Sequence, residues 1–239
     1  MALALFVWTG PCFAQSAPGD RVRATLQALA SPDYAVRERT TWRLLRDDDL
    51  SARHIADLYA AAETPEQRHR LLDVARHHAV RRMRDRAFDA PGDRGAIGMT
   101  HHREALPPGS VPGLDLPAIE VIQPMPGFPA YTYLRPGDLI VGLDGENLPV
   151  EDTMGHFKRV LQSHRPGQRV QLTIHRAGEL HEHALRLASY EALNLVYNAG
   201  AARMPLRSPF REQWLQTRAD LLAEGPTPTP LRVTPLSRD

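Results

Sequence analysis

Histidine is the residue type with the most evident capacity for chemistry in this sequence. His181 and His183 stand two positions apart in an expected strand, so both side chains should project from one face, and His175 lies across the expected hairpin. Three imidazoles could bind zinc or copper. No cysteine or carboxylate completes the set at a spacing typical of metal sites, so we predict no metal and no cofactor.

The common hydrolase motifs are missing from the sequence. "PGSVPG" does not have the Gly-x-Ser-x-Gly spacing of a nucleophile elbow, and "HEH" at 181–183 is not His-Glu-x-x-His. We therefore predict that the chain is not an enzyme.

Backbone N–H groups are the stronger candidates for a binding site. In "RGAIGM", which begins at Arg94, Gly95 and Gly98 free the backbone to turn N–H groups into a small nest that receives a carboxylate. Ile97 and Met99 would flank the nest, and the charge of Arg94 would attract the same anion. The strand that begins near Met99 should accept a peptide as an additional strand.

A helix is expected at about residues 152–163, and the family resemblance stated below implies that it forms the opposite wall of a groove beside this strand. Phe157 and Val160 should point to the core, whereas other side chains of the helix face the peptide. The predicted peptide-binding residues are Arg94, Gly95, Ala96, Ile97, Gly98, Met99, Met154, Lys158 and Leu161.

Short strands must position these residues. "DLIVGLDG" alternates apolar side chains so that one face is buried, and Asp144-Gly145 and Ala177-Gly178 suit tight hairpin turns. Five or six such strands with one or two small helices indicate an α+β fold built around a small, partly open β-barrel.

Residues 19–88 show a helical period instead. Ser31-Pro32-Asp33 and Thr64-Pro65-Glu66 each supply a cap, a first-turn proline and an acid, and Thr64 with Gln67 makes a capping box. The two starts lie 33 residues apart, and "SPDYAVRERTTWRLL" loosely resembles a HEAT-type helix. A plain pair of helical hairpins is the alternative. So short a repeat unit should pack on a neighbour or partner.

Residues 94–188 resemble a PDZ domain of the kind found in bacterial periplasmic serine proteases of the high-temperature-requirement type. "RGAIGM" resembles the carboxylate-binding loop of that group, and "PGFPAYTYLRPGDLIVGLDGENL" its short helix, turn and hairpin. "FKRVLQSHRPGQRVQLTIHRAGE" resembles the second helix and the closing strands. The resemblance implies a PDZ domain over residues 91–190, without the catalytic domain of those proteases.

The sequence departs from the family pattern at two places. "FPAYTYL" places Tyr131 and Tyr133 where small residues are usual, and "LPPGSVPGLDLP" makes a long proline-rich connection after the binding strand. Either feature could narrow or cover the groove.

The ends of the chain suggest export. Residues 1–14 resemble a signal peptide without a clear basic region, so we expect a periplasmic or secreted protein. C-terminal helices are expected over 191–224, followed by a disordered Pro/Thr-rich tail over 225–239. A formal net charge of +1 argues against nucleic-acid binding, and no apolar run is long enough for an integral membrane span.

We predict a non-catalytic exported adaptor whose PDZ groove captures a protein C-terminus or an extended segment, while the helical region binds a second protein. One alternative is an accessory or regulatory subunit of a periplasmic protease made by another chain. Another is a structural protein whose groove is closed by the proline-rich loop or by its own tail.

Overall fold

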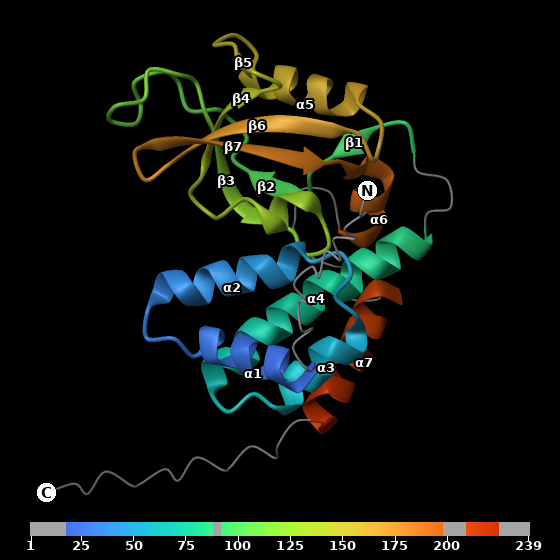
Figure 1. Cartoon of the computed structure of the whole chain (residues 1–239). Coiled ribbons are helices and arrows are strands. Elements are labelled where there is room, and N and C mark those ends of the chain that lie inside the picture. Colours follow the sequence, from blue (N-terminus) through green and yellow to red (C-terminus); the bar gives the residue numbers. More distant parts are fainter. Residues whose placement is uncertain (1–17, 88–91, 198–208, 225–239) are drawn as a thin grey trace, which may run out of the picture.

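The computed structural model describes residues 18–87, 92–197 and 209–224. The N-terminal helices and the C-terminal helix lie on one side of the molecule, and the strands lie on the other, with one further helix beyond them (Figure 1). The α+β class predicted from the sequence is confirmed. The α-helices are α1 (Pro18–Leu29), α2 (Tyr34–Arg46), α3 (Ala52–Ala60), α4 (Pro65–Ala87), α5 (Thr153–Ser163), α6 (Tyr190–Val196) and α7 (Pro209–Glu224).

The strands form one large and one small sheet. The large sheet has the strand order β2-β3-β4-β6-β7, with β5 beside β4, and the small sheet pairs β1 with β8. The bounds are β1 (Gly95–Ala96), β2 (Met99–His101), β3 (Ile119–Pro124), β4 (Leu139–Leu143), β5 (Glu146–Asn147), β6 (Arg169–Arg176), β7 (Glu179–Arg186) and β8 (Ala188–Ser189), with a 3-10 helix η1 (Pro129–Thr132). Since β2 and β7 do not pair within the described residues, the expected partly open barrel is an open sheet.

The predicted helix starts differ in accuracy. Thr64 and Gln67 make the expected capping box, because the Gln67 N–H donates to Thr64 Oγ1 at 3.2 Å and the Thr64 N–H donates to Gln67 Oε1 at 2.8 Å. At the earlier start the cap is Asp33, whose carboxylate accepts the Ala35 N–H, so α2 begins later than a cap at Ser31 implies.

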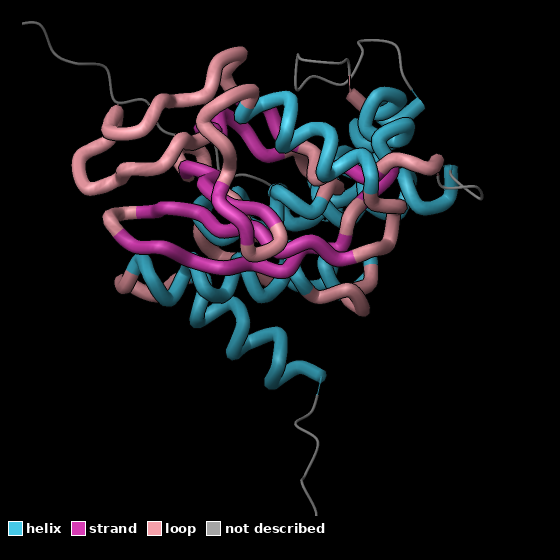
Figure 2. Tube along the Cα trace, turned by 90° about the horizontal axis from the view of Figure 1, so that it is seen from above, coloured by secondary structure: helices cyan, strands magenta, loops and turns pink. Residues whose placement is uncertain are grey.

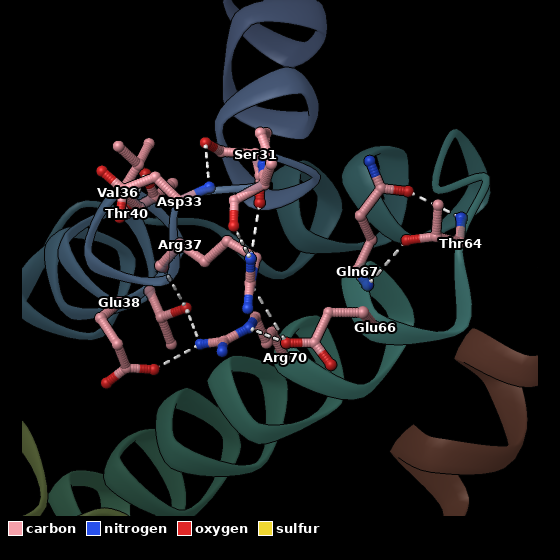
Figure 3. Close-up of polar contacts among 12 residues, drawn as sticks. Ser31, Asp33, Val36, Arg37, Glu38, Thr40, Thr64, Glu66, Gln67 and Arg70 are labelled. Carbon is pink, nitrogen blue, oxygen red and sulfur yellow. Dashed lines mark hydrogen bonds and ion pairs between the residues drawn. The ribbon is translucent and has the colours of Figure 1, made fainter.

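Charged side chains tie the starts of α2 and α4 together (Figure 3). Arg70 of α4 contacts Glu38 of α2 at 2.6 Å and Glu66 of its own helix at 2.7 Å. The Arg37 guanidinium donates to the Ser31 carbonyl at 2.6 Å. The two helices therefore have a fixed orientation relative to each other.

The C-terminal helix completes the core of the N-terminal helices. Leu221 of α7 is buried in the same apolar cluster as Leu29, Leu58 and Leu71, and Trp214 packs against it. We call α1–α4 together with α7 the helical region. Seen from above, the strands lie across these helices (Figure 2).

Both faces of β4 are buried, not one as the sequence pattern predicts. Ile140 and Leu143 join the main core of the sheet, whereas Leu139 and Val141 join a second cluster. An irregular register between Ile140 and Gly142 shifts the alternation, which lets Ile140 and Leu143 share a face. The second cluster includes Leu106, Val111, Leu114 and Leu116 of the proline-rich connection.

The two predicted hairpin turns are confirmed. Asp144 and Gly145 have φ values of 54° and 84°, and Ala177 and Gly178 have values of 52° and 88°. Positive φ at both central positions is the geometry of a type I′ turn. Ala177 therefore adopts a left-handed conformation that is costly for a residue with a Cβ.

An apolar seam joins the helical region to the sheet. Val80 of α4, Phe128 before η1 and Tyr197 after α6 are buried in one cluster. Polar contacts reinforce this seam, because the Gly127 N–H donates to Nδ1 of buried His77 at 3.0 Å. The Tyr197 hydroxyl donates to the Pro126 carbonyl at 2.9 Å.

Candidate functional site

The loop from Arg94 to Met99 lies between the C-terminal end of α5 and Phe128. Gly95 permits the close approach to α5, because a Cβ there would lie 2.9 Å from the Leu161 carbonyl oxygen and 3.0 Å from that of His164. The Gly95 N–H donates to the His164 carbonyl at 2.7 Å. Gly95 thus anchors the loop and does not offer its N–H to a ligand.

The N–H groups of Ile97 and Gly98 have no hydrogen-bond partner within the described part of the chain. Their carbonyl groups are used, since Ile97 accepts from Ala130 at 2.8 Å and Gly98 accepts from Met125 at 2.9 Å. Gly98 has a φ of +75°, and a side chain there would collide with Phe128. Two successive free amides beside a left-handed residue are a nest suited to an anion.

Strand β2 continues from this nest as an edge of the large sheet. Met99 faces Pro124 and Thr100 faces Gln123 across the β2–β3 pair. Because the Gly98 carbonyl points to β3 and Pro124 has no N–H, the alternation of an antiparallel ladder turns the N–H and C=O of Met99 toward the free edge. Within the described residues no strand pairs with that edge.

Apolar side chains of the predicted site meet in one place. Ile97, Met99 and Leu161 belong to the main core cluster, and Met154 packs against it. Lys158 is exposed on α5. The structure therefore places both walls of the predicted groove around a common apolar floor, with the one lysine of the chain at the surface.

The predicted orientation of α5 is correct for Phe157 and only partly for its neighbours. Phe157 and Leu161 are both buried, one helical turn apart, whereas Val160 is half-buried against the core. Leu161 contributes to the floor of the site because residues four apart share a helix face.

Arg94 is engaged by another side chain. Its guanidinium donates to Glu191 Oε1 at 2.8 Å and lies 4.6 Å from the centroid of the Tyr190 ring. The Arg94 hydrogen bond lowers the pKa of Glu191 against the opposing effect of burial, so the carboxylate stays charged. This pairing offsets the charge that was expected to attract a ligand.

The two departures from the family pattern make contacts in other parts of the molecule. Tyr131 stacks on His77 of α4 at 5.4 Å between ring centroids, and the Tyr133 ring lies 4.6 Å from the Arg46 guanidinium of α2. Both tyrosines thus contact the helical region. The proline-rich connection packs on Leu139 and Val141, on the face of β4 opposite to the main core.

Phe128 is the residue of this region that the sequence analysis missed. It is 1% exposed, packs against Tyr197 at 5.9 Å between ring centroids and limits position 98 to glycine. The one local sign in the sequence is that Phe128 follows Gly127, a glycine whose φ is +85° in the structure. The sequence does not indicate which residue the Phe128 ring contacts.

The three strand histidines do not form a cluster. His181 and His183 stack on one face at 6.5 Å between ring centroids, as predicted. His175 pairs with Leu180, one position out of phase with His181, so its side chain projects from the opposite face. Among the described residues there is no group of three potential metal ligands.

Comparison with known proteins identifies the sheet and α5. The family model described as PDZ domain matches residues 95–187. These residues form a PDZ domain. The nest, β2 and α5 all lie inside the matched range.

Two solved structures of proteases show weaker similarity. A variant of the HtrA-type protease AlgW with decapeptide has 20% sequence identity and a TM-score of 0.35, covering 54% of this chain and 36% of that chain. The HtrA-type protease AlgW with decapeptide has 22% identity and a TM-score of 0.33, covering 40% and 29%. The matched parts are about a third of those chains. No curated protein matches the chain.

Within the described residues, no helix has the length and apolar character needed to cross a membrane. Residues 1–14 and 225–239, for which a signal peptide and a disordered tail were predicted, lie outside the described residues.

Proposed function

We propose that this protein is a non-catalytic adaptor whose PDZ domain captures a protein C-terminus or an extended segment by β-strand addition. The observation that carries the proposal is the free edge of β2, which begins at the unpaired N–H groups of Ile97 and Gly98. A ligand carboxylate would accept from these N–H groups, and the preceding residues would pair with β2.

The surroundings of the nest suit a carboxylate followed by an apolar side chain. Gly95 to Met99 are all buried, and a hydrogen bond to a charged acceptor is strong where water is excluded. Ile97, Met99 and Leu161 provide the apolar surface beside the nest. These features support the proposal that the arrangement binds a ligand without reacting with it.

A free carboxylate is the feature to test. We expect a fluorescent peptide with an apolar C-terminal residue and a free carboxylate to bind more tightly than its amidated twin, by fluorescence anisotropy. Loss of one charge-assisted hydrogen bond, worth about 1.5–3 kcal/mol, corresponds to roughly ten-fold or more in affinity. Equal affinity of the two peptides would refute capture of a C-terminus.

The exposed Lys158 offers a positional test. Because it is the single lysine of the chain, a peptide that carries an amine-reactive group should cross-link there when it lies between β2 and α5. Lys158→Arg keeps the charge and removes the reactive amine, so it serves as the matched control. Undiminished cross-linking in that variant would place the peptide elsewhere.

We further propose that the protein is periplasmic or secreted and that residues 19–88 contribute to binding a second protein. These proposals rest on the signal-like N-terminus and on the HEAT-like pattern of the helices. Secretion of a reporter fused to residues 1–20 tests the first, and retention of that reporter in the cytoplasm would contradict it.

A further inference from the structure

An open hollow lies between α2 and the PDZ domain, away from the β2 edge. It encloses about 670 Å³. Tyr133 lies at the end of η1, Arg135 in the turn before β4, and the other lining residues come from α2, its C-terminal cap and the end of β6. We call this the arginine hollow, lined by Arg39, Trp42, Arg43, Arg46, Asp47, Tyr133, Arg135 and Arg176.

Two of its arginines already contact carboxylates. Arg176 makes two short hydrogen bonds to Asp138, which is 2% exposed, at 2.6 and 2.7 Å. Arg135 lies 3.7 Å from Glu38, a carboxylate that Arg70 also binds. The Arg135 pair joins the PDZ domain to α2, whereas the Arg176 pair lies within the PDZ domain.

The other three arginines have no carboxylate partner in the described part of the chain. Arg39 and Arg43 are exposed on α2, four residues apart, and therefore on one helix face. Arg46 donates to the Thr132 carbonyl at 3.0 Å. Asp47 is the one acid among the lining residues. The hollow thus has an excess of positive charge, although the whole chain has a formal net charge of +1.

Aromatic rings lie beside two of the guanidinium groups. Arg46 lies 4.6 Å from the Tyr133 ring centroid and 5.6 Å from that of Trp42, and Arg135 lies 5.4 Å from Trp42. Stacking on a ring restricts an arginine side chain, so less conformational entropy is lost when a ligand binds. Trp, Tyr and Arg are also the residue types enriched at the energetic centres of protein interfaces.

We propose that the arginine hollow binds an acidic segment of another protein. A guanidinium fork matches a carboxylate with two parallel hydrogen bonds, and all but one of the Lys and Arg residues of the chain are arginine. The volume suits a few side chains. Outside the lining residues the formal net charge of the chain is −3, which disfavours a nucleic acid as the ligand.

The hollow is a different site from the PDZ groove and can be tested without it. The probe is a fluorescein-labelled peptide of alternating glutamate and glycine with an amidated C-terminus, which gives the nest at Ile97 and Gly98 no terminal carboxylate. Fluorescence anisotropy should show saturable binding to the full chain that weakens as salt is raised.

Charge-reversal variants assign the binding to the hollow. Arg39→Glu/Arg43→Glu should weaken binding at least ten-fold, since each lost charge-assisted contact corresponds to about ten-fold or more. Arg53→Glu/Arg218→Glu changes the net charge equally at two exposed arginines of α3 and α7, and should retain affinity within about two-fold. All four positions are exposed, so both variants should fold, which thermal unfolding by circular dichroism checks.

Three results would overturn the proposal. They are unchanged affinity in Arg39→Glu/Arg43→Glu, an equal loss in the control variant, and tighter binding to vesicles of anionic phospholipid or to inorganic phosphate than to the peptide. The last result would assign the hollow to a phosphate group. Retained binding of a C-terminal peptide in Arg39→Glu/Arg43→Glu would separate this site from the proposed function of the β2 edge.

Discussion

The β2 edge lies within the PDZ domain, whereas the arginine hollow lies between that domain and α2, and the two present opposite chemistry. The edge offers backbone N–H groups at Ile97 and Gly98 above an apolar floor, whereas the hollow offers guanidinium groups between aromatic rings. The comparison shows how one PDZ domain can bind a ligand by itself at one site and share a second site with a helix outside it. One depends on the shape of the main chain and the other on side-chain charge.

Removing Phe128 should have the largest effect and should damage both sites. Phe128 is 1% exposed and packs against Tyr197 and the nest, so Phe128→Ala should destabilise the protein by about 3–5 kcal/mol, measured by urea unfolding. Phe128→Leu, which leaves a smaller cavity, is the matched variant, and its free energy of unfolding should fall by less. If Phe128→Ala lowers the free energy of unfolding by less than about 1 kcal/mol, the apolar seam does not hold the Arg94–Met99 loop in place.

Changing Gly98 should affect the two sites differently. Gly98→Ala adds a Cβ that would collide with Phe128, on a residue whose φ is +75°. The variant should therefore have left-handed strain of about 1–2 kcal/mol and an additional packing cost. C-terminal peptide binding should fall, whereas binding of the glutamate peptide should remain.

Gly109→Ala is the control for that variant. Gly109 has a φ of +76° with open space around it, so it tests the strain alone. If both variants bind the C-terminal peptide equally well, the geometry of the nest is not what selects the ligand.

Acid should weaken the packing around His77 and His78 of α4. Burial lowers the pKa of His77 well below 6.5 and that of His78 to about 4. Above pH 6.5 both imidazole rings are neutral in the folded and in the unfolded protein. As the pH falls, the unfolded chain takes up protons first, so stability is lost by about 1.4 kcal/mol per pH unit for each histidine.

Urea unfolding between pH 7 and pH 4.5 tests this dependence. His78→Gln should reduce the slope of the free energy of unfolding against pH, and His54→Gln on α3 should leave that slope unchanged. A slope that is identical in the two variants would exclude His78 as its source.

The smallest expected effect concerns the turn of the β6–β7 hairpin at Ala177, which lines neither site although it follows Arg176 of the hollow. Ala177 has a φ of 52°, so Ala177→Gly removes left-handed strain of about 1–2 kcal/mol and adds about 0.5–1 kcal/mol of backbone entropy. A net gain of about 0.5–1 kcal/mol in thermal unfolding is expected, with both binding affinities unchanged. A change in either affinity would show that the hairpin is coupled to that site.

Local patterns account for what the sequence predicted correctly. The capping box at Thr64, the turns at Asp144 and Ala177 and the PDZ motifs each depend on residues close together in the chain. Such features need no knowledge of distant contacts. The roles of individual peptide-binding residues remain predictions.

Contacts between distant segments account for the rest. The arginine hollow combines α2 with Tyr133 and Arg176, and α7 reaches the N-terminal core through Leu221. No local pattern reports such pairings. Likewise, both faces of β4 are buried because the register shifts beside Gly142 and a proline-rich segment folds over Val141.

Chemical-shift mapping tests the proposed capture of a C-terminus most directly. In ¹⁵N-labelled protein, a peptide with a free carboxylate should shift the amide resonances of Ile97, Gly98 and Met99 most strongly, and its amidated twin should leave Ile97 and Gly98 nearly unmoved. Equal shifts with both peptides, or shifts confined to residues outside β2 and its loop, would contradict capture of a C-terminus at this edge.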